Sequence, residues 1–529
     1  MQIKHLLTLL AIVISTFTYA HPAHADAKII YIPLDNRPVC LDYVQDTAQK
    51  AGYNLAVPPV KLLSNHKDGG NMEGLWKWLE AEAPTARAAV LATDSLNYGG
   101  LVASRKHEYS FRFLAEKTVL LQSLNAINPY MKIFAFSTIM RTPRQSAGNV
   151  EPNYYDYFGP SIFRLSQLED KEDNKSLTVN ELQEKYDLLR KIPSYLLLDW
   201  NDRREKNLRT NEQLIDMAHD NVFEFLAIGK DDCAPLSRTH MESRHLAKSA
   251  AANKLSSKKF QIVPGVDQLG MLLVTRAINE LKGSTPKIYV EYAPGKGGST
   301  IPLYSDESVH DSIAHQIIVL GAKETSNKEK ADLILAVNTP FNGVFQDSTS
   351  NENAPYGSEA NKKFAKELSA LTKVHPVALA DISYANGSDN GFMLELENRN
   401  LLPSFAAYSG WNTADNSIGF ALAQGVLAKN MSQQDKENLL KIRYLDDWIY
   451  QSNIRYRLAL EIERQDFKLK YDLGKYYNKI LGATNKYFTK YTSQEPFLKG
   501  TNYTVEFPWN RLFEIDVKIS TTRLTGGLL

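Results

Sequence analysis

The sequence predicts an α/β protein that combines mostly parallel sheets with flanking helices. From Lys28 to about residue 300, short runs of β-branched and aromatic residues alternate with longer amphipathic stretches, as in repeated βαβ units. Five apolar runs also stop at acidic or amide side chains, in the segments IIYIPLDNRP, AVLATDSLNYGG, FEFLAIGKDD, FQIVPGVD and PVALADISYANGSDNG. Both observations favour Rossmann-like layers, in which polar loops follow the carboxyl ends of buried strands.

The N-terminal residues 1–25 are expected to be a secretory signal peptide that takes no part in the fold. Lys4 precedes an apolar run over residues 6–20, and the sequence Ala-His-Ala at 23–25 offers a cleavage site. This run is too short and too weakly flanked for a membrane span, and no later segment is apolar enough to cross a bilayer. We therefore predict a secreted protein, periplasmic or extracellular, without a membrane span after signal cleavage. An uncleaved N-terminal anchor is the alternative.

Residues 26–300 are predicted to form an N-terminal α/β domain. A helical insertion interrupts its strand rhythm at residues 151–219, where Thr178 and Glu181 have the spacing of a capping box, and we expect this insertion to cover the crevice. The expected strands are Lys28–Leu34, Ala88–Thr93, Lys132–Thr138, Val222–Ile228, Phe260–Val263 and Lys287–Tyr292. The expected helices are Val39–Ala51, Met72–Ala83, Phe111–Ile127 and Ser237–Lys254.

A second α/β domain is predicted at residues 301–430, followed by a helical region at 431–529 that ends in a small β piece. The boundaries rest on Gly, Pro and Ser residues around 294–302 and on a change of hydrophobic period near 430. The expected elements of the second domain are strands Asp332–Val337 and Val377–Ala380 and helices Ser358–Leu371 and Ser417–Ala428. A Tyr- and Lys-rich helical region is expected from Ser432 to about residue 485, with alternating strand-like residues at 503–519.

Charge and composition exclude several classes of protein. Removing residues 1–25 takes away Lys4 and no acidic residue, so 60 basic side chains face 60 acidic ones. Nucleic-acid binding needs a basic face, and no long Lys/Arg block is present, so nucleic acid is not an expected partner. Cys40 and Cys233 are the only cysteines, which excludes a disulfide framework. One disulfide between them and two buried free thiols are both open interpretations.

The acidic residues that follow the predicted strands are the main functional clue. Because the carboxyl ends of parallel strands open onto one crevice, we expect these carboxylates to converge although they are far apart in sequence. Asn36 and Arg37 follow the first of them in a loop whose backbone is restricted by Pro33 and Pro38. The residues expected to converge are Asp35, Asp94, Asp231, Asp232, Asp267 and Asp381.

Asp231 and Asp232 form the sharpest of these motifs. Two adjacent carboxylates after a buried strand repel each other unless a cation, hydrogen bonds or protonation relieves them. Each of these environments shifts a pKa into the range useful for acid–base catalysis, so one of the pair is a candidate general acid or base. The alternative is an Asp that caps a helix ahead of Pro235.

Arginines and amides accompany the acidic clusters. Arg105 follows a Gly99-Gly100 turn, and Arg141 lies just past the third strand. They are expected to hold an anionic or hydroxyl-rich ligand, or to neutralise acids across the crevice.

The second domain contributes Asn386, Trp411 and Asn412, which we expect to bind substrate. Trp411 beside several amides suggests a stacking platform for a sugar, with a place in the core as the alternative. The zinc motif HExxH and the EF-hand spacing are both absent, so no metal or cofactor is predicted. Ca²⁺ or Mg²⁺ bound by Asp and Asn oxygens is the alternative.

Seven ordered motifs show a resemblance to a known family. They are IPLDNRPV, TDSLNYGGLVASR, AIGKDDCAP, VPGVDQLG, LAVNTPF, ADISYANGSDN and YSGWNTADNSIG. This set resembles the bacterial family of uncharacterised proteins with domain of unknown function 4127, over about residues 28–515. The resemblance implies no activity. An acidic residue usually follows the Asp of the GxD motif in the family, whereas Gln268 stands there in this chain.

The leading functional interpretation is an exported hydrolase, glycosidase-like, that acts on a glycan or glycoconjugate. Glycoside hydrolysis uses two carboxyl groups across the scissile bond, and we assign them to Asp232 with Asp94 or Asp35. Three arginines would hold the substrate: Arg37, Arg105 and Arg141. A second interpretation is a metal-dependent enzyme on a phosphate, amide or sugar, with Asp35, Asp94, Asp231 and Asp232 as ligands. A third is a non-catalytic carbohydrate-binding protein of the envelope.

Overall fold

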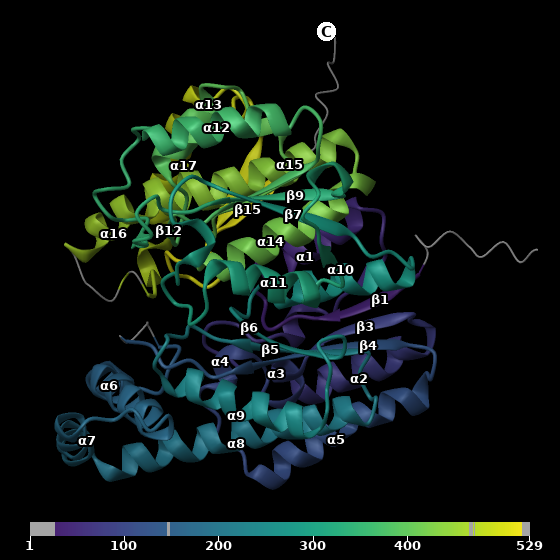
Figure 1. Cartoon of the computed structure of the whole chain (residues 1–529), viewed down its shortest axis with the longest axis vertical. Helices are drawn as coiled ribbons and strands as arrows, with labels where there is room; N and C mark the ends of the chain where they lie inside the picture. Colours follow the sequence, from purple (N-terminus) through teal and green to yellow (C-terminus); the bar gives the residue numbers. More distant parts are fainter. Residues whose placement is uncertain (1–26, 145–148, 465–468, 470, 521–529) are drawn as a thin grey trace, which may run out of the picture.

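Two parallel β-sheets form the framework of the chain (Figure 1). The computed structural model describes residues 27–144, 149–464, 469 and 471–520, so the expected signal peptide at 1–25 lies outside it. All strand pairs within these two sheets are parallel, and helices cover both faces of each. The predicted α/β class is confirmed.

The first sheet has the strand order β2-β1-β3-β4-β5-β6. Strands β1, β3 and β5 are buried along their whole length, as expected for parallel strands with both faces covered. The strands are β1 (Ile29–Ile32), β2 (Leu55–Ala56), β3 (Ala88–Ala92), β4 (Lys132–Ile139), β5 (Phe225–Lys230) and β6 (Phe260–Pro264). All five strands predicted before residue 264 are therefore present, with small shifts at their ends.

The second sheet has the order β13-β11-β9-β7-β8. Its strands are β7 (Lys287–Tyr292), β8 (Lys323–Glu324), β9 (Leu333–Asn338), β11 (Val377–Asp381) and β13 (Ala407–Ser409). Strand β7 was expected to belong with the N-terminal strands, but it pairs with β9 in the second sheet. The chain therefore changes sheet before residue 287 and not near 300, because the Gly-rich segment after β7 is a loop inside the second layer. A separate short pair joins β10 (Gln346–Asp347) to β12 (Tyr384–Ala385).

A layer of helices lies between the two sheets (Figure 1). Helices α10 and α14 contact each other, and they also contact β3 of the first sheet and β11 of the second, respectively. Side chains from both sheets and from these helices share one apolar core. The helices of this layer are α1 (Asp42–Lys50), α10 (Leu269–Leu281), α11 (Val309–Val319) and α14 (Ala414–Leu427). The shared core fixes the two sheets relative to each other.

Outer helices cover the remaining face of each sheet, with an apolar core of its own on each side. The first sheet is covered by α2 (Met72–Glu82), α3 (Thr93–Asn97), α5 (Phe111–Ile127) and α9 (Arg238–Ala252). The second is covered by α12 (Glu359–Leu371), α13 (Asn390–Glu397), α15 (Gln433–Arg443) and a π-helical segment, Tyr444–Ile454. The remaining short helices are α4 (Leu101–Ser104) and the 3-10 turns Val60–Leu62, Ala83–Thr85, Gly297–Ser299, Lys328–Lys330, Leu402–Ser404, Ala428–Asn430 and Gly474–Tyr476.

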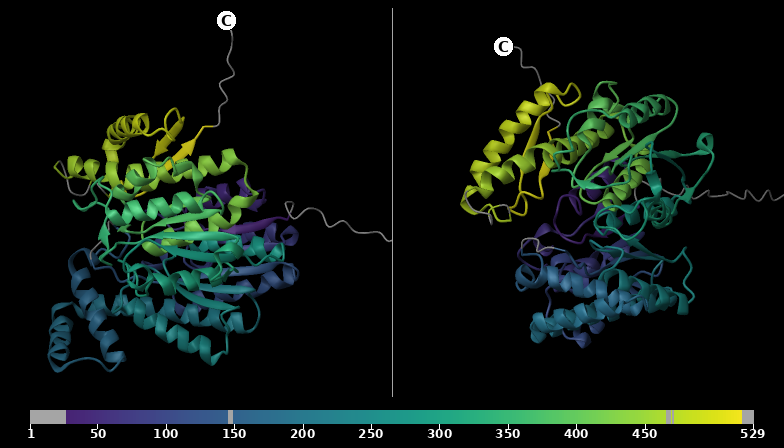
Figure 2. Two further views of the ribbon diagram at one scale, coloured as in Figure 1. Left: turned by 45° about the horizontal axis from the view of Figure 1, so that its top comes forward. Right: turned by 60° about the vertical axis from the view of Figure 1, so that its left-hand side comes forward.

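The predicted helical insertion consists of α6 (Tyr155–Asp173), α7 (Val179–Lys191) and α8 (Ser194–His219). Thr178 and Glu181 make the expected capping box, in which each side chain accepts a hydrogen bond from the backbone of the other residue. The end formed by α6 and α7 projects from the first sheet (Figure 2, left). The second half of α8 returns under the sheet, where Leu214 and Ile215 join its core.

The C-terminal region packs against the outer side of the second sheet (Figure 2, right). It contains α16 (Arg455–Glu463), α17 (Tyr477–Gln494) and an antiparallel pair of β14 (Tyr503–Glu506) and β15 (Asp516–Ile519). The predicted helical region with a small β piece is confirmed. No helix in the described residues is both long enough and apolar enough to span a bilayer.

Candidate functional site

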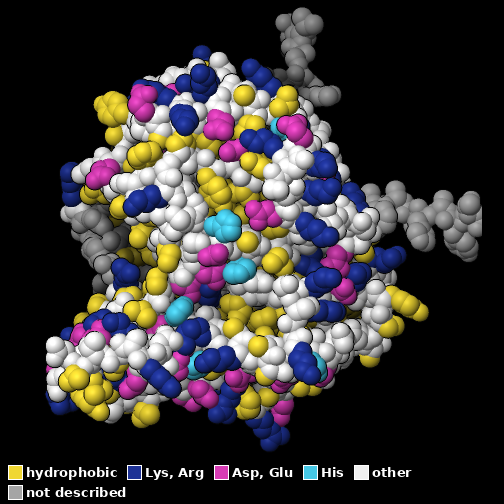
Figure 3. Space-filling model, viewed as in Figure 1, with side chains coloured by type: hydrophobic (Ala, Val, Ile, Leu, Met, Phe, Trp, Pro, Cys, Tyr) yellow, Lys and Arg dark blue, Asp and Glu magenta, His cyan; other side chains and the backbone are white. Residues whose placement is uncertain are grey.

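A cavity of about 970 Å³ lies where the carboxyl ends of both sheets meet the C-terminal region. Its charged lining is made of six arginines and four aspartates: Arg37, Arg105, Arg141, Arg144, Arg455 and Arg511, with Asp231, Asp232, Asp267 and Asp347. On the face of the molecule shown in Figure 3, basic and acidic side chains are interspersed without a field of one sign. The concentration of arginine inside the cavity is therefore a local feature.

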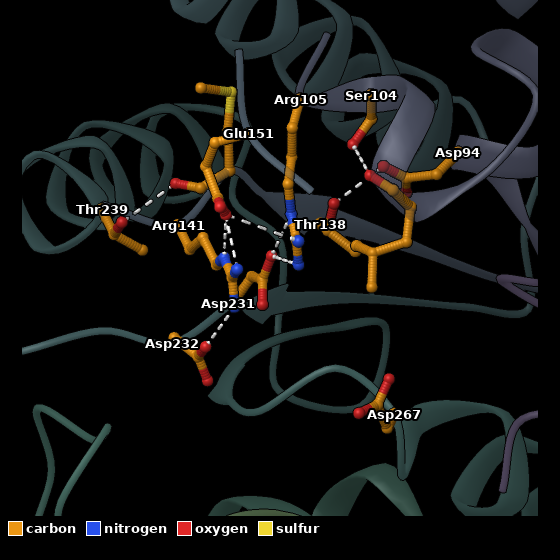
Figure 4. Close-up of polar contacts among 12 residues, drawn as sticks. Asp94, Ser104, Arg105, Thr138, Arg141, Glu151, Asp231, Asp232, Thr239 and Asp267 are labelled. Atoms are coloured by element: carbon orange, nitrogen blue, oxygen red, sulfur yellow. Dashed lines mark hydrogen bonds and ion pairs between the residues drawn. The ribbon is translucent and has the colours of Figure 1, made fainter. Parts of the chain in front are cut away.

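A row of five alternating charges forms the wall of the cavity beside the first sheet (Figure 4). Arg105 Nε donates to Asp231 Oδ2 at 3.0 Å, and Arg141 Nη1 donates to Asp232 Oδ2 at 2.6 Å. Glu151 joins the two arginines, because its Oε1 lies 2.6 Å from Arg141 Nε and 3.8 Å from Arg105 Nη1. Two guanidinium groups thus relieve the repulsion between adjacent carboxylates that the sequence predicted.

A second ion-pair group surrounds Arg37 at the end of β1. Its Nε lies 3.0 Å from Asp35 Oδ1, and its Nη2 lies 2.6 Å from Asp267 Oδ1. The same Nη2 lies 3.4 Å from Cys40 Sγ, and the guanidinium carbon lies 5.2 Å from the centre of the Trp509 ring. Arg37 and Asp267 line the cavity, whereas Asp35 is 1% exposed and sits behind them. Cys40 is a buried free thiol.

The other cysteine, Cys233, is also a buried free thiol, so the disulfide interpretation is not supported. Its backbone N–H donates to the carbonyl of Tyr304 at 3.1 Å. This bond ties the loop after β5 to the segment between β7 and α11. Tyr304 is thereby placed beside the Asp232 loop.

Asp94 is not placed against the cavity. It belongs to the first turn of α3, immediately after β3, and is 1% exposed. Thr138 Oγ1 donates to its Oδ1 at 2.7 Å, while its Oδ2 has no hydrogen-bond partner among the residues that the structure describes. Burial raises the pKa of Asp94 to about 7. Figure 4 shows Asp94 to the right of Arg105, on the side away from Asp232.

Asp381 lies in the second sheet, away from the cavity lining. Asn338 Nδ2 donates to its Oδ1 at 2.8 Å, and the backbone N–H of Asp389 donates to its Oδ2 at 2.9 Å. The expected convergence of six carboxylates is therefore only partial. Asp231, Asp232 and Asp267 line the cavity, and Asp35 reaches it through Arg37.

Trp411 is a core residue and not a platform in the cavity. It is 2% exposed and packs edge-on against Phe420, with 6.3 Å between ring centres. Trp509 lines the cavity instead, although it is only 4% exposed. Asn36 does not line it but accepts a hydrogen bond from Trp509 Nε1 at 2.7 Å, so it orients that ring.

Three residues of the cavity have left-handed backbone conformations. Their φ angles are 65° for Tyr304, 61° for Asn386 and 61° for Asn412. Asn386 N–H donates to the carbonyl of Asn412 at 2.6 Å, which holds two of these turns together. Non-glycine residues with positive φ cost free energy and concentrate at functional sites, which supports this cavity as the functional site.

The comparison with protein families matches residues 29–518 to the family described as protein of unknown function (DUF4127). The chain belongs to this family. The DUF4127 match spans both sheets, the helical insertion and most of the C-terminal region, so it includes every lining residue named above. Neither a curated protein nor a solved structure matches the chain.

Several cavity residues of this DUF4127 protein were missed by the sequence analysis: Tyr304, Asp347, Arg455, Trp509 and Arg511. Asp347 lies in the two-residue strand β10. Burial tends to raise its pKa, but Arg455 and hydrogen bonds from Thr349 and Asn386 outweigh burial, so the pKa of Asp347 lies below its ordinary value. The only local signal is the polar run QDSTSNEN, which lacks a preceding apolar strand of useful length.

The four aspartates considered as metal ligands are engaged separately. Asp35 pairs with Arg37, and Asp231 pairs with Arg105. Within the described residues, no group of three or more His, Cys, Asp or Glu side chains is arranged to hold a metal ion. A cation bound by these carboxylates would have to displace their guanidinium partners or lie beside them, where the like charges repel each other.

The buried carboxyl of Asp94 predicts a pH-dependent stability. Its folded pKa of about 7 exceeds the unfolded value of about 3.9, so its contribution is complete below about pH 4 and is lost as the pH rises through 7. We expect Asp94→Asn to reduce the fall in unfolding free energy between about pH 5 and pH 8. Urea unfolding across that range measures how the free energy of unfolding changes with pH. Asp220→Asn, at an exposed site, is the control, and an unchanged pH slope in the Asp94 variant would contradict the assignment.

Proposed function

We propose that this protein is an exported hydrolase of a glycan or glycoconjugate, with Asp232 and Asp347 as its two catalytic carboxyl groups. One observation carries the proposal: both residues line the same cavity, and their pKa values are shifted in opposite directions. Paired carboxyl groups with opposite shifts are the arrangement that assigns one acid and one base. Export rests on the signal-like sequence at residues 1–25.

Asp232 is the proposed general acid. Burial raises its pKa most strongly, Arg141 lowers it and Asp231 raises it again, so the pKa lies above its ordinary value. Its side chain is 25% exposed, which leaves it accessible from the cavity. A carboxyl group whose pKa is raised is suited to protonate a leaving oxygen.

Asp347 is the proposed base or nucleophile, in place of Asp94 and Asp35. Asn386 Nδ2 donates to its Oδ2 at 2.7 Å, and Thr349 N–H donates to its Oδ1 at 3.0 Å, so the ionised form is stabilised. Burial raises the pKa of Tyr304, and the charges of Asp232 and Asp347 both raise it further. Tyr304 is therefore close enough to both carboxyl groups for their charges to act on it. A substrate bound between the two groups would be subject to both charges in the same way.

The first test is release of reducing ends from a panel of purified polysaccharides and glycoconjugates. We expect cleavage of at least one of them, with unchanged rates in the presence of a chelator. Rates that collapse in chelator would favour the metal-dependent interpretation instead. Binding without any product would favour a carbohydrate-binding protein and would overturn the hydrolase.

The pH profile of the cleavage is a second expected result. Because the pKa of Asp347 is lowered, kcat/KM should rise as this group loses its proton below the ordinary carboxyl range. Because the pKa of Asp232 is raised, kcat/KM should fall when this group loses its proton above that range. Initial rates from about pH 3 to about pH 9 measure both limbs. A rate independent of pH in that interval would contradict the pair.

A further inference from the structure

The part of the cavity wall contributed by the C-terminal region carries arginines next to aromatic rings. The Arg455 guanidinium carbon lies 5.1 Å from the centre of the Phe513 ring, and that of Arg511 lies 5.8 Å from the same ring. Arg511 also lies 4.9 Å from the centre of the Trp509 ring. Stacking fixes the plane of a guanidinium and leaves its N–H edge free for a planar anion.

These two arginines differ in their partners. Arg511 donates to both carboxylate oxygens of Glu514, which is 2% exposed at its side chain. Arg455 has no ion pair in the described part of the chain. Two cations therefore share one aromatic ring, and only one of them has a carboxylate partner.

Arg455 keeps donors that no described residue accepts from. Its Nη2 donates to the carbonyl of Asn386 at 3.3 Å, and its Nε is buried without a hydrogen-bond partner among the described residues. A buried donor without a partner is unfavourable, so the chain itself leaves this guanidinium incompletely paired. The positive charge of Arg455 lowers the pKa of Asp347. The guanidinium of Arg455 therefore lies near the proposed base.

We infer that the substrate carries an anionic group, a carboxylate, phosphate or sulfate, which Arg455 binds beside Phe513. This inference rests on the proposed hydrolase and specifies its substrate class as an acidic sugar. The reason is chemical: guanidinium groups form charge-assisted, planar hydrogen bonds with oxyanions, and Arg455 is the cavity arginine with open donors and no acid partner on this wall. Arg511 adds positive charge at the same ring.

The test is equilibrium binding of glucuronate, glucose 6-phosphate, glucose 6-sulfate and glucose to the mature chain by calorimetry. At least one acidic sugar should bind about tenfold or more tightly than glucose, and the strongest of the three identifies the anion. Arg455→Gln should weaken that binding about tenfold or more. Arg457→Gln is the matched control, because Arg457 lies on the same helix, stacks on Tyr491 at 6.0 Å and is exposed outside the cavity.

Two results overturn the inference: glucose binding as tightly as every acidic sugar, or unchanged affinity in Arg455→Gln. If that variant does not fold, Arg455→Lys replaces it and should also lose affinity, because an ammonium lacks the planar pair of donors. Arg455-dependent binding of an acidic sugar without cleavage of any acidic glycan supports the anion site and rejects the hydrolase. Cleavage of neutral glycans, with no acidic sugar bound more tightly than glucose, rejects the anion site and supports the hydrolase.

Discussion

For the proposed hydrolase, replacing Asp232 with Asn is expected to lower kcat about 10²- to 10⁴-fold on its glycan substrate. Asn has nearly the same shape, and its oxygen still accepts from Arg141 Nη1, the contact that measures 2.6 Å in the structure. It cannot donate the proton that a leaving oxygen needs. Initial rates at saturating substrate, with an unfolding curve for each variant, separate lost chemistry from lost folding.

The leaving group provides a specific control for this role. An aryl glycoside whose phenol needs no protonation should restore much of the rate in Asp232→Asn, because the general acid is then dispensable. Asp220→Asn, at an exposed position after α8, should retain full activity on both substrates. Full activity of Asp232→Asn on the natural glycan would remove Asp232 from the mechanism.

The part of the site at the first sheet could largely be predicted, because its residues directly follow strands in the sequence. Strands β1, β5 and β6 read as apolar runs that end in a polar loop, and parallel strands deliver such loops to one edge. Arg37, Asp232 and Asp267 therefore line one cavity although 230 positions separate Arg37 from Asp267. Asp94 follows a strand but does not line the cavity. Helix α3 begins directly after β3 and turns the carboxyl of Asp94 toward Thr138.

The second-sheet half was less predictable, because an apolar run does not reveal which sheet a strand joins. Strand β7 resembles its predecessors in sequence but pairs with β9. Asp381 ends β11 in the predicted second domain, but its carboxyl accepts from Asn338 and Asp389 and does not reach the cavity. Helix α10 was also not predicted. It lies between the two sheets and is buried continuously from Leu269 to Asn279, including the polar residues Thr275, Arg276 and Asn279.

The C-terminal contribution depends on tertiary packing alone. Arg455 begins α16 directly after a π-helical segment, and Trp509 lies in an irregular stretch before β15. Neither follows a strand, so no periodicity marks them as site residues. The sequence instead drew attention to Trp411, whose amide-rich neighbours suggested a sugar platform but whose ring is buried in the core.

Replacing Arg37 with Met is expected to destabilise the fold by about 3–5 kcal/mol. The guanidinium bridges Asp35 and Asp267, whose side chains are 1% and 4% exposed. Without it, two carboxylates stay buried next to each other with no cation between them, which costs far more than the lost contacts with Trp509. Urea unfolding of the mature chain at neutral pH measures the difference.

The pH dependence and a charge-removal variant distinguish this cause from simple loss of packing. Burial already raises the pKa of Asp267 while Arg37 lowers it, so removing Arg37 should raise the folded pKa further above the unfolded value of about 3.9. The penalty should therefore be smaller near pH 5 than near pH 8, since a protonated carboxyl needs no cation. The triple variant Arg37→Met, Asp35→Asn, Asp267→Asn should recover a large part of the stability, because no uncompensated charge remains. Equal losses at both pH values, or no recovery in the triple variant, would show that Arg37 acts through packing and not through charge.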